Sequence, residues 1–314
     1  MDRAGAVAKN NVIKIGSRGS ALALRQTNEV LGHLRSNHPD LEFEVVIVTT
    51  SGDRDQTAPL AGMGLGVFVK EIEQQLLSGQ LDLAVHSLKD LPTRLPQGLF
   101  LGAMLRRQDA RDVLVNRWNR RLEDLPPGAR IGTSSPRRQA QLRNLCPQVA
   151  VLPIRGNVET RLSKAAGADY DGAVLAAAGM IRLGLSQQIT EYLSPHRFVP
   201  APGQGVLAVE VRADDDRMLG LLHPLDHAPT RYAATAERAF LEKLGGGCQL
   251  PVGAYAQSNG EIMVLTVFLS DPAGQRVYRS KVQGLARDPR QLASDAYLAL
   301  VERGGAELLK SVQG

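Results

Sequence analysis

The sequence has few aromatic residues and no long run of positive charge. Phe, Trp and Tyr make up 4% of the 314 residues, too few for the stacking platforms on which single-stranded nucleic acids bind. Lys and Arg exceed Asp and Glu, 37 to 32, but basic residues never form a run of five. This excess favours a small anionic ligand over the backbone of a nucleic acid. We therefore predict that the chain binds no nucleic acid.

Long apolar runs are also missing. No stretch approaches the ~20 apolar residues of a membrane-spanning helix. The segment Met1 to Asn11 has no apolar core of a secretion signal. We therefore expect a cytoplasmic protein without a membrane partner.

Cysteine is rare as well. The chain has 2 cysteines, Cys146 and Cys248, which argues against a disulfide scaffold. We interpret Cys146, near the end of a predicted helix, as a small buried apolar side chain. His223 and His227 flank a proline and have no further ligand nearby, so we predict no metal site.

Predicted strands and helices alternate over the first two thirds of the chain. The expected strands are 12–15, 43–49, 81–85, 129–132, 149–154 and 173–176, and the expected helices are 21–35, 68–77, 158–166 and one that begins at Pro136. This order is typical of α/β domains with mostly parallel sheets. We predict two such domains. The segment 200–205 is expected to cross between them, and the strand 206–211 is a candidate to return to the first sheet.

The last part of the chain has a different pattern, which predicts a small α+β domain. It contains a helix over 230–244 that Gly245 caps, a hairpin of the strands 262–269 and 276–282, and a closing helix over 289–309. The predicted boundaries are 12–105 with 200–222 for the first α/β domain, 106–199 for the second and 223–314 for the third.

Cationic and hydroxyl side chains follow the ends of the predicted strands. These residues are Arg18, Ser20, Ser87, Lys89, Thr133, Ser135, Arg155, Arg161 and Arg182. Open α/β sheets bind ligands beyond the carboxyl ends of their strands. Any one of these cations could be a solvated surface charge. As a set on one rim they predict a ligand with several carboxylates, because a planar guanidinium binds both carboxylate oxygens.

Arg137 and Arg138 are the most informative pair. Ser135 is a good N-cap and Pro136 a good first helical residue, so both arginines fall in the first turn of a helix. The helix dipole disfavours cations at that end. Their presence predicts an anion bound against them, with help from the amides of the same turn.

Two further residues have side chains suited to chemistry. Asp90 is the one acid among these cations, which should keep it ionised and able to stabilise a developing positive charge. Cys248 follows the glycines 245–247 at the end of a helix, where no dipole activates its thiol. It is either an attachment point for a ligand or a buried structural cysteine.

Taken together, these segments resemble the porphobilinogen deaminase family, also called hydroxymethylbilane synthases. The motifs are Ile15-Gly16-Ser17-Arg18, Val85-His86-Ser87-Leu88-Lys89-Asp90, Gly132-Thr133-Ser134-Ser135-Pro136-Arg137-Arg138, Ile154-Arg155-Gly156-Asn157-Val158, Pro202-Gly203-Gln204-Gly205 and Gly246-Gly247-Cys248-Gln249. The resemblance implies two α/β domains like type II periplasmic binding proteins and a third, α+β domain with the cofactor cysteine. It also implies condensation of four porphobilinogen molecules into hydroxymethylbilane with loss of ammonia, usually by a monomer.

The resemblance assigns roles to individual residues. It implies a dipyrromethane cofactor joined to Cys248 as a thioether, and it makes Asp90 the catalytic residue. The implied cofactor ligands are Ser87, Lys89, Thr133, Ser135, Arg137 and Arg138, and the implied substrate ligands are Arg18, Ser20, Arg155, Arg161, Arg182 and Gln204.

One segment departs from the family pattern. Residues 61–68 are one residue shorter than usual and lack both of the family's lysines, so the resemblance does not carry over the family's role for this segment as a cover over the site. Two alternatives stay open at this point. The chain could be a noncatalytic carboxylate-binding protein of the periplasmic type, or, against its composition, a nucleic-acid binder.

Overall fold

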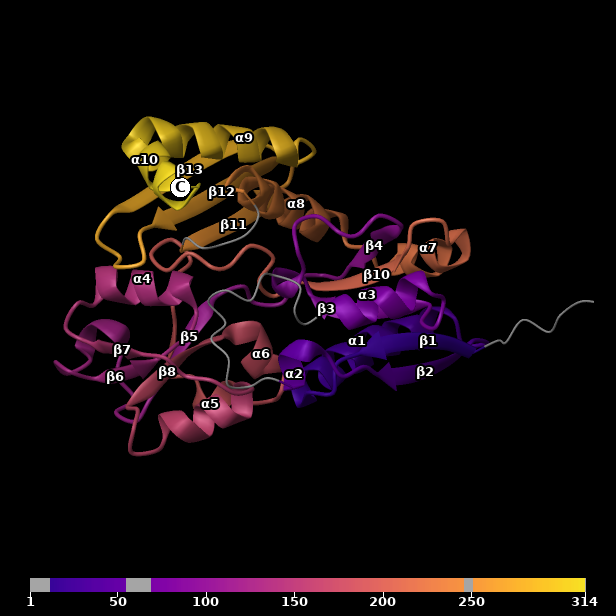
Figure 1. Ribbon diagram of the computed structural model, residues 1–314, viewed down its shortest axis with the longest axis horizontal. Coiled ribbons are helices and arrows are strands. Elements are labelled where there is room, and N and C mark those ends of the chain that lie inside the picture. The colour runs from indigo at the N-terminus through magenta and orange to yellow at the C-terminus, as the bar shows by residue number, and fades with distance from the viewer. Residues whose placement is uncertain (1–11, 55–68, 246–250, 314) are drawn as a thin grey trace, which may run out of the picture.

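A computed structural model describes residues 12–54, 69–245 and 251–313. Within these residues the chain forms three sheets (Figure 1). Two have five strands, in the orders β2-β1-β3-β10-β4 and β7-β6-β8-β5-β9, and the third has three, β11-β12-β13. Helices cover the sheets, so each sheet has its own core.

The first sheet combines the N-terminal strands with one that arrives much later in the chain. Its strands are β1 (Val12–Ser17), β2 (Glu42–Ile47), β3 (Leu83–Ser87), β4 (Leu99–Met104) and β10 (Leu207–Arg212), and its helices are α1 (Ala21–Asn37), α2 (Ser51–Arg54), α3 (Lys70–Leu77) and α7 (Asp216–Leu222). β1 runs parallel to β2 and β3, whereas β10 lies antiparallel between β3 and β4. The predicted return of the strand at 206–211 is confirmed.

The second sheet repeats this plan. Its strands are β5 (Asp112–Asn116), β6 (Arg130–Gly132), β7 (Ala150–Leu152), β8 (Gly172–Ala176) and β9 (Glu191–Tyr192), and its helices are α4 (Pro136–Leu145), α5 (Val158–Ala165) and α6 (Ala177–Arg182). β6 is parallel to β7 and β8, and β5 lies antiparallel between β8 and β9. Each α/β sheet therefore has one antiparallel strand, formed where the chain crosses over from the other α/β sheet. Two α/β domains were predicted from the sequence.

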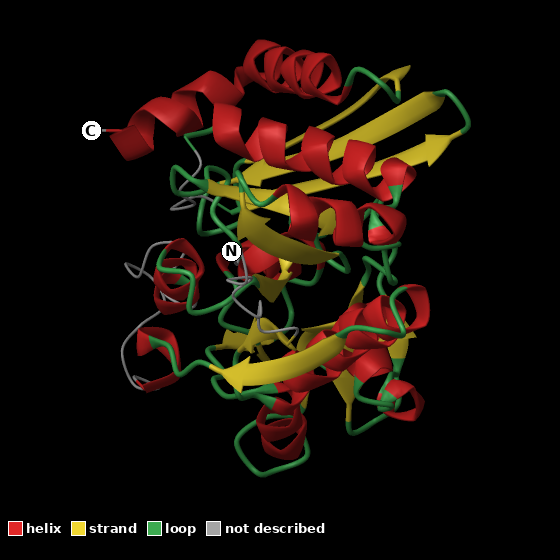
Figure 2. Cartoon of the chain, turned by 90° about the vertical axis from the view of Figure 1, so that its right-hand side faces the viewer, coloured by secondary structure: helices red, strands yellow, loops and turns green. Residues whose placement is uncertain are grey.

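The third sheet is a meander of β11 (Val252–Asn259), β12 (Ile262–Ser270) and β13 (Val277–Leu285). In Figure 2, helices cover one face of this sheet. They are α8 (Ala228–Lys243), α9 (Pro289–Leu300) and α10 (Ala306–Gln313). The predicted hairpin is confirmed, but the single closing helix over 289–309 is not. Gly304 has φ 93° there and divides α9 from α10.

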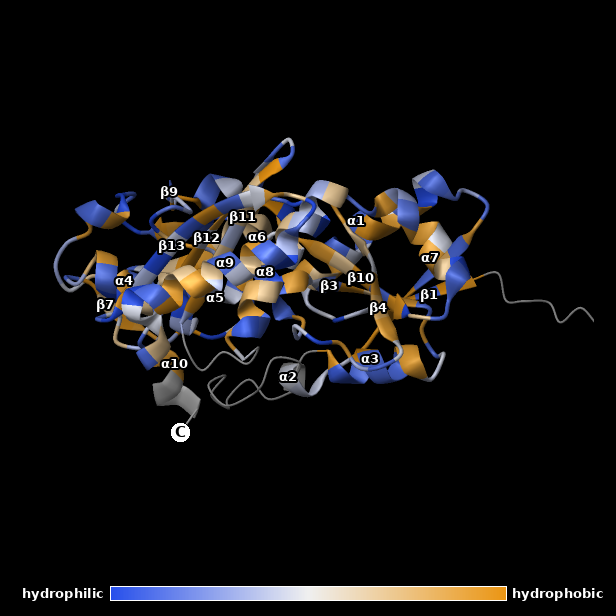
Figure 3. Cartoon of the chain, turned by 90° about the horizontal axis from the view of Figure 1, so that it is seen from above, coloured by the Kyte–Doolittle hydropathy of each residue, from blue (hydrophilic) through white to orange (hydrophobic). Residues whose placement is uncertain are grey.

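Apolar side chains lie between the helices and the sheets. Phe240 of α8 and Leu292 of α9 pack on the third sheet at 0% and 1% exposure, together with Leu265 of β12. In Figure 3, β4 and β10 of the first sheet are largely hydrophobic, whereas α3 carries hydrophilic as well as hydrophobic residues. None of the helices in the described residues is long and apolar enough to span a bilayer.

Candidate functional site

The acidic residue of the candidate site follows β3 directly. A single 3-10 turn, Leu88–Asp90, begins where β3 ends at Ser87. The Leu88 side chain is fully buried, and its N–H donates to the carbonyl of Val206 over 3.0 Å. This anchor leaves Lys89 and Asp90 half-buried at the carboxyl end of the strand.

Lys89 lies within electrostatic range of the second sheet's arginines. Burial is the main cause that lowers its pKa to about 8; Asp90 and Asp112 oppose this effect, whereas Arg138 and Arg137 add to it. The turn after β3 and the start of α4 therefore face the same space, although they belong to different sheets.

The start of α4 has the predicted local structure. Ser135 is the N-cap, its Oγ accepts from the N–H of Arg138, and Pro136 occupies the first turn. Arg137 and Arg138 follow in that turn, as expected. Their exposed fractions are only 5% each, so the two guanidinium groups are largely withdrawn from water.

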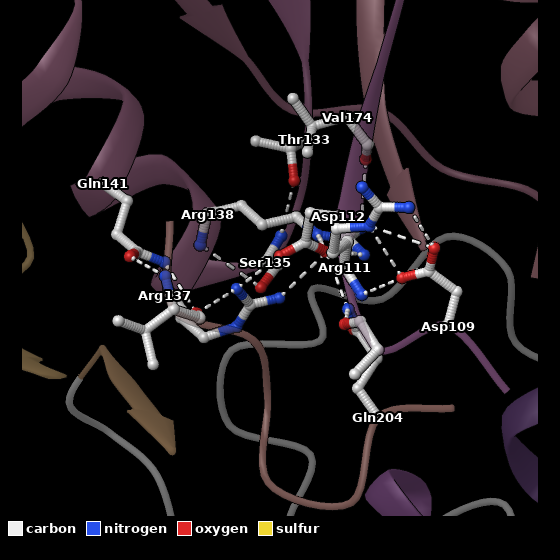
Figure 4. Close-up of polar contacts among 12 residues, drawn as sticks. Asp109, Arg111, Asp112, Thr133, Ser135, Arg137, Arg138, Gln141, Val174 and Gln204 are labelled. Atoms are coloured by element: carbon white, nitrogen blue, oxygen red, sulfur yellow. Dashed lines mark hydrogen bonds and ion pairs between the residues drawn. The ribbon is translucent and has the colours of Figure 1, made fainter. Parts of the chain in front are cut away.

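Arg137 and Arg138 share an acidic partner within the protein, which the sequence did not predict. Nη1 of Arg137 lies 2.6 Å from Oδ2 of Asp112, and Nη2 of Arg138 lies 2.7 Å from Oδ1 of the same residue. Figure 4 shows Asp112 between the two guanidinium groups. This carboxylate is the first residue of β5 and has no exposed surface. The protein itself thus provides one negative charge at the helix start.

Asp112 is held in its ionised form. Burial raises its pKa, but the positive charges of Arg137 and Arg138 outweigh that effect and hold the pKa well below its usual range. Gln204 adds a bond from Nε2 to Oδ1 over 3.1 Å and also donates to the carbonyl of Ala110. The predicted ligand-binding amide of Gln204, 1% exposed, is thus engaged with the protein.

Backbone carbonyls complete the environment of the two arginines. Nη1 of Arg137 donates to the carbonyl of Val199 over 2.7 Å, and Nη1 of Arg138 donates to that of Val174 over 3.0 Å. The orientation of both side chains is therefore determined before any ligand binds.

α5 brings a further cation to the same space. Asn157 caps this helix, and Arg161 in its first turn donates from Nε to the carbonyl of Gly156 over 2.8 Å. Burial lowers the pKa of Arg161 to about 10; Arg138 and Arg155 also lower it, and Asp90 raises it. Arg161 therefore lies within electrostatic range of the acid on the first domain.

The corner before α5 requires glycine. Gly156 has φ 117°, and a Cβ there would lie 2.5 Å from Cγ2 of Thr160. The chain can therefore turn sharply directly after Arg155, and this turn brings Arg155 and Arg161 near each other.

These residues form what we call the cationic cluster. It consists of Lys89, Asp90, Asp112, Arg137, Arg138, Arg155 and Arg161. Its five cations outnumber its two carboxylates by three. Such an excess in a partly desolvated place suits a ligand with several carboxylates.

The predicted hydroxyl ligands build turns. Ser20 caps α1 and accepts from the N–H of Ala23 over 3.2 Å. Ser87 accepts from Nε2 of Gln26 over 2.8 Å, and Oγ1 of Thr133 accepts from the N–H of Ser135. Arg18 is half-buried at the end of β1.

Arg182 has a partner that was not predicted. Its Nε lies 2.8 Å from Oε2 of Glu29, and Nη2 is 3.4 Å from the carbonyl of Gly205. Glu29 belongs to α1 and Arg182 to α6, so the ion pair joins the two α/β domains. Arg182 thus has an acidic partner within the protein, which a substrate carboxylate must share or displace.

Three residues were missed in the sequence: Asp112, Glu29 and Gln26. β5 itself was not predicted, so nothing identified Asp112 as a strand residue pointing inward. Glu29 and Gln26 are polar positions on a predicted helix, where a solvated surface is the ordinary interpretation. Only helix-face periodicity could have suggested that Gln26, 7% exposed, points inward.

Two predicted features lie outside the described residues, namely Cys248 and the segment 61–68. Gly245, with φ 96°, ends α8 and donates to the carbonyl of Glu242, as predicted. Cys146 is buried at 3% exposure, also as predicted, and burial raises the pKa of its thiol. No cluster of metal-binding side chains occurs among the residues that the structure describes.

Comparison with solved structures gives low overall similarity. The methionine binding protein MetQ is 11% identical and has a TM-score of 0.44, covering 76% of this chain and 97% of that chain.

Comparison with sequence families is far more specific. Residues 13–220 match the model described as porphobilinogen deaminase, dipyromethane cofactor binding domain, and residues 231–302 match the porphobilinogen deaminase C-terminal domain. The porphobilinogen deaminase of Thermus thermophilus is 45% identical over 96% of this chain and 99% of its own length. That of Roseiflexus castenholzii is 48% identical over 95% and 99%. These matches do not favour the noncatalytic alternative, and the chain belongs to the porphobilinogen deaminase family.

Proposed function

We propose that the chain performs the reaction of its family, the condensation of four porphobilinogen molecules into hydroxymethylbilane with release of ammonia. The observation that carries the proposal is the cationic cluster around Asp90, to which both α/β domains contribute. Porphobilinogen carries an acetate and a propionate, so each added ring brings two more negative charges. A site that holds a growing chain of such rings needs an excess of guanidinium groups.

Asp90 is the proposed catalytic residue. As a carboxylate among cations it accepts hydrogen bonds from pyrrole N–H groups. It also stabilises the positive charge that develops on the substrate as ammonia leaves. A fixed charge in a partly dry site is more effective for this than a charge in water.

The residues present fit a dipyrromethane cofactor, which belongs to this family and supplies the pyrrole ring to which the first substrate becomes attached. We assign its attachment to Cys248 and its carboxylates to Lys89, Arg137 and Arg138. A guanidinium has five N–H donors, so the arginines can bind Asp112 and a ligand together. Ser87, Thr133 and Ser135 complete the proposed set.

The substrate and the growing chain are assigned to Arg18, Ser20, Arg155, Arg161, Arg182 and Gln204. Some of these have internal partners that a ligand must share or displace, among them Glu29 for Arg182 and Asp112 for Gln204. We further propose a cytoplasmic monomer with domains 12–105 plus 200–222, 106–199 and 223–314.

Intact-mass measurement tests this proposal. Freshly purified protein should exceed its sequence mass by one dipyrromethane and give colour with an aldehyde reagent for pyrroles. Cys248→Ser should fold without the adduct, whereas the matched control Cys146→Ser should keep it. Asp90→Ala should keep the adduct and lose turnover of porphobilinogen. A normal adduct on Cys248→Ser, or wild-type turnover by Asp90→Ala, would refute the assigned roles.

A further inference from the structure

An arginine of the third domain binds the backbone on both sides of Asp90 through several hydrogen bonds, a contact that we call the grip of Arg238. Arg238 lies on α8, and its guanidinium donates to carbonyl oxygens of the segment 88–93. The N···O distances are 3.5 Å to Leu88, 3.2 Å to Leu91, 2.5 Å to Pro92 and 3.2 Å to Thr93. One side chain thus binds four carbonyls on a stretch of six residues.

The surroundings of Arg238 suit a structural cation more than an ion pair. Within the described residues no carboxylate lies at ion-pair distance from it; Glu242 and Glu210 act on it only from farther away. Burial lowers its pKa to about 10, so it stays positive at neutral pH. A half-buried cation whose partners are carbonyl dipoles fixes the positions of those carbonyls, because leaving them unbound would cost free energy.

The gripped segment contains both functional residues of the turn. Lys89 and Asp90 lie between the carbonyl of Leu88 and that of Leu91, which Arg238 joins. Leu88 and Leu91 are buried at 0% and 2% exposure. The two leucines hold the inner side of the turn by packing, and Arg238 holds its backbone from the third domain.

We propose that Arg238 is a positioning residue that holds Asp90 and Lys89 in place against the arginines of the second domain. The inference rests on the proposed function in taking Asp90 as the catalytic carboxylate. Displacement of a reacting group by about 1 Å can cost on the order of 100-fold in rate. Loss of the grip should therefore lower kcat with little effect on the binding of substrate.

The same helix offers a matched control. Arg231 lies two turns earlier on α8 and also donates to backbone carbonyls of the first domain, those of Leu101 and Gly102, as well as to Asp226. It differs in that its carbonyl partners belong to β4 and not to the turn with Asp90. Arg231 variants therefore report the effect of weakening the contact between domains alone.

The experiment compares Arg238→Lys and Arg238→Gln with Arg231→Lys and Arg231→Gln as cofactor-loaded proteins. The lysine variant keeps the positive charge, so it should fold even if the glutamine variant does not. It cannot bind four carbonyls at once, so it should still lose the positioning of the turn. We expect kcat to fall about 10- to 100-fold in the Arg238 variants, with KM for porphobilinogen changed less than about threefold. Arg231 variants should keep kcat within about threefold of the wild type.

Hydrogen–deuterium exchange provides a readout that does not depend on turnover. Amides of the segment 88–93 should exchange faster in both Arg238 variants than in the Arg231 variants and the wild type. Unchanged exchange there, or a loss of kcat equal to that of the Arg231 variants, would overturn the proposal. Failure of the wild type to make hydroxymethylbilane would refute the proposed function, whereas the exchange data would still test the grip of Arg238.

Discussion

Lys89 is the residue whose charge is most sensitive to its surroundings. With a pKa of about 8, lowered mainly by burial, its ammonium loses the positive charge as pH rises through 8. Carboxylate binding should weaken accordingly, so kcat/KM should decline above about pH 8. Lys89→Arg stays charged over this range, and the decline should disappear. A rate profile from pH 6 to 10 measures this, and an unchanged alkaline decline in Lys89→Arg would contradict the assignment.

Asp112 determines whether two buried arginines can lie side by side. Asp112→Asn keeps the shape but removes the charge that balances Arg137 and Arg138. Breaking a buried ion pair costs about 3–5 kcal/mol, and urea titration should show a loss of that order. Asp171→Asn is the control, because its partner Arg130 is 39% exposed in its side chain and the pair should contribute far less. Equal losses in the two variants would show that burial is not decisive here.

At the scale of elements, α3 meets the first sheet through buried acids. Glu73 of α3 is 7% exposed. It lies near Glu210 of β10 and His86 of β3, whose Nε2 is 3.0 Å from Oε2 of Glu210. Burial raises the pKa of Glu73 from 4.5 to about 7; Glu210 raises it further and His86 opposes this. The contact between helix and sheet is therefore most favourable when Glu73 carries a proton.

The sign of the pH effect follows from this raised pKa. Between pH 4.5 and 7 the folded state keeps a proton that the unfolded state releases, so stability falls as pH rises through that window. Glu73→Gln should remove this slope and raise the unfolding free energy at pH 8 by on the order of 1–3 kcal/mol. Denaturant titrations at pH 5 and 8 measure both effects. Glu44→Gln, exposed on β2, is the control, and a wild-type slope in Glu73→Gln would contradict the explanation.

At the scale of the whole molecule, α8 of the third domain contacts the first domain and the crossover through adjacent residues. Arg238 grips the turn with Asp90, and Glu237 accepts bonds from Arg107, from the N–H of Gly203 and from that of Ala256. Another contact joins the third domain to α4: a Cβ on Gly274 would lie 2.4 Å from the carbonyl of Ala140. The third domain thus contacts both of the α/β domains that contribute to the candidate site.

Glu237 joins three segments through these hydrogen bonds and has no exposed surface. Glu237→Gln leaves the largely buried guanidinium of Arg107, 13% exposed in its side chain, without its charged partner, which should lower the unfolding free energy by about 3–5 kcal/mol. Glu242→Gln should lower it by at most about 1 kcal/mol, because its partner Arg94 is 84% exposed in its side chain. Both values come from urea titration monitored by circular dichroism. A similar small loss in the two variants would mean that the domains are held by other contacts.

Much of the fold could be predicted because its signals are local. Ser20, Ser135 and Asn157 cap helices that begin where the sequence indicated, since a cap is a bond between residues two or three apart. β4, β5, β9 and β11 were not predicted. β5 begins with a charged residue, and its strand character comes from pairing with β8 and β9, which no short window of sequence contains.

The sequence by itself determined where cations stand relative to strands and helix starts, and its motifs were sufficient to indicate the family. Only the tertiary structure decided which group each cation meets. Asp112 lies 25 residues from Arg137, and Arg238 is 145 to 150 residues from the carbonyls that it binds. The physical reason is that the partner of a buried charge is selected by proximity and loss of water in three dimensions, and these depend on the packing of all three sheets.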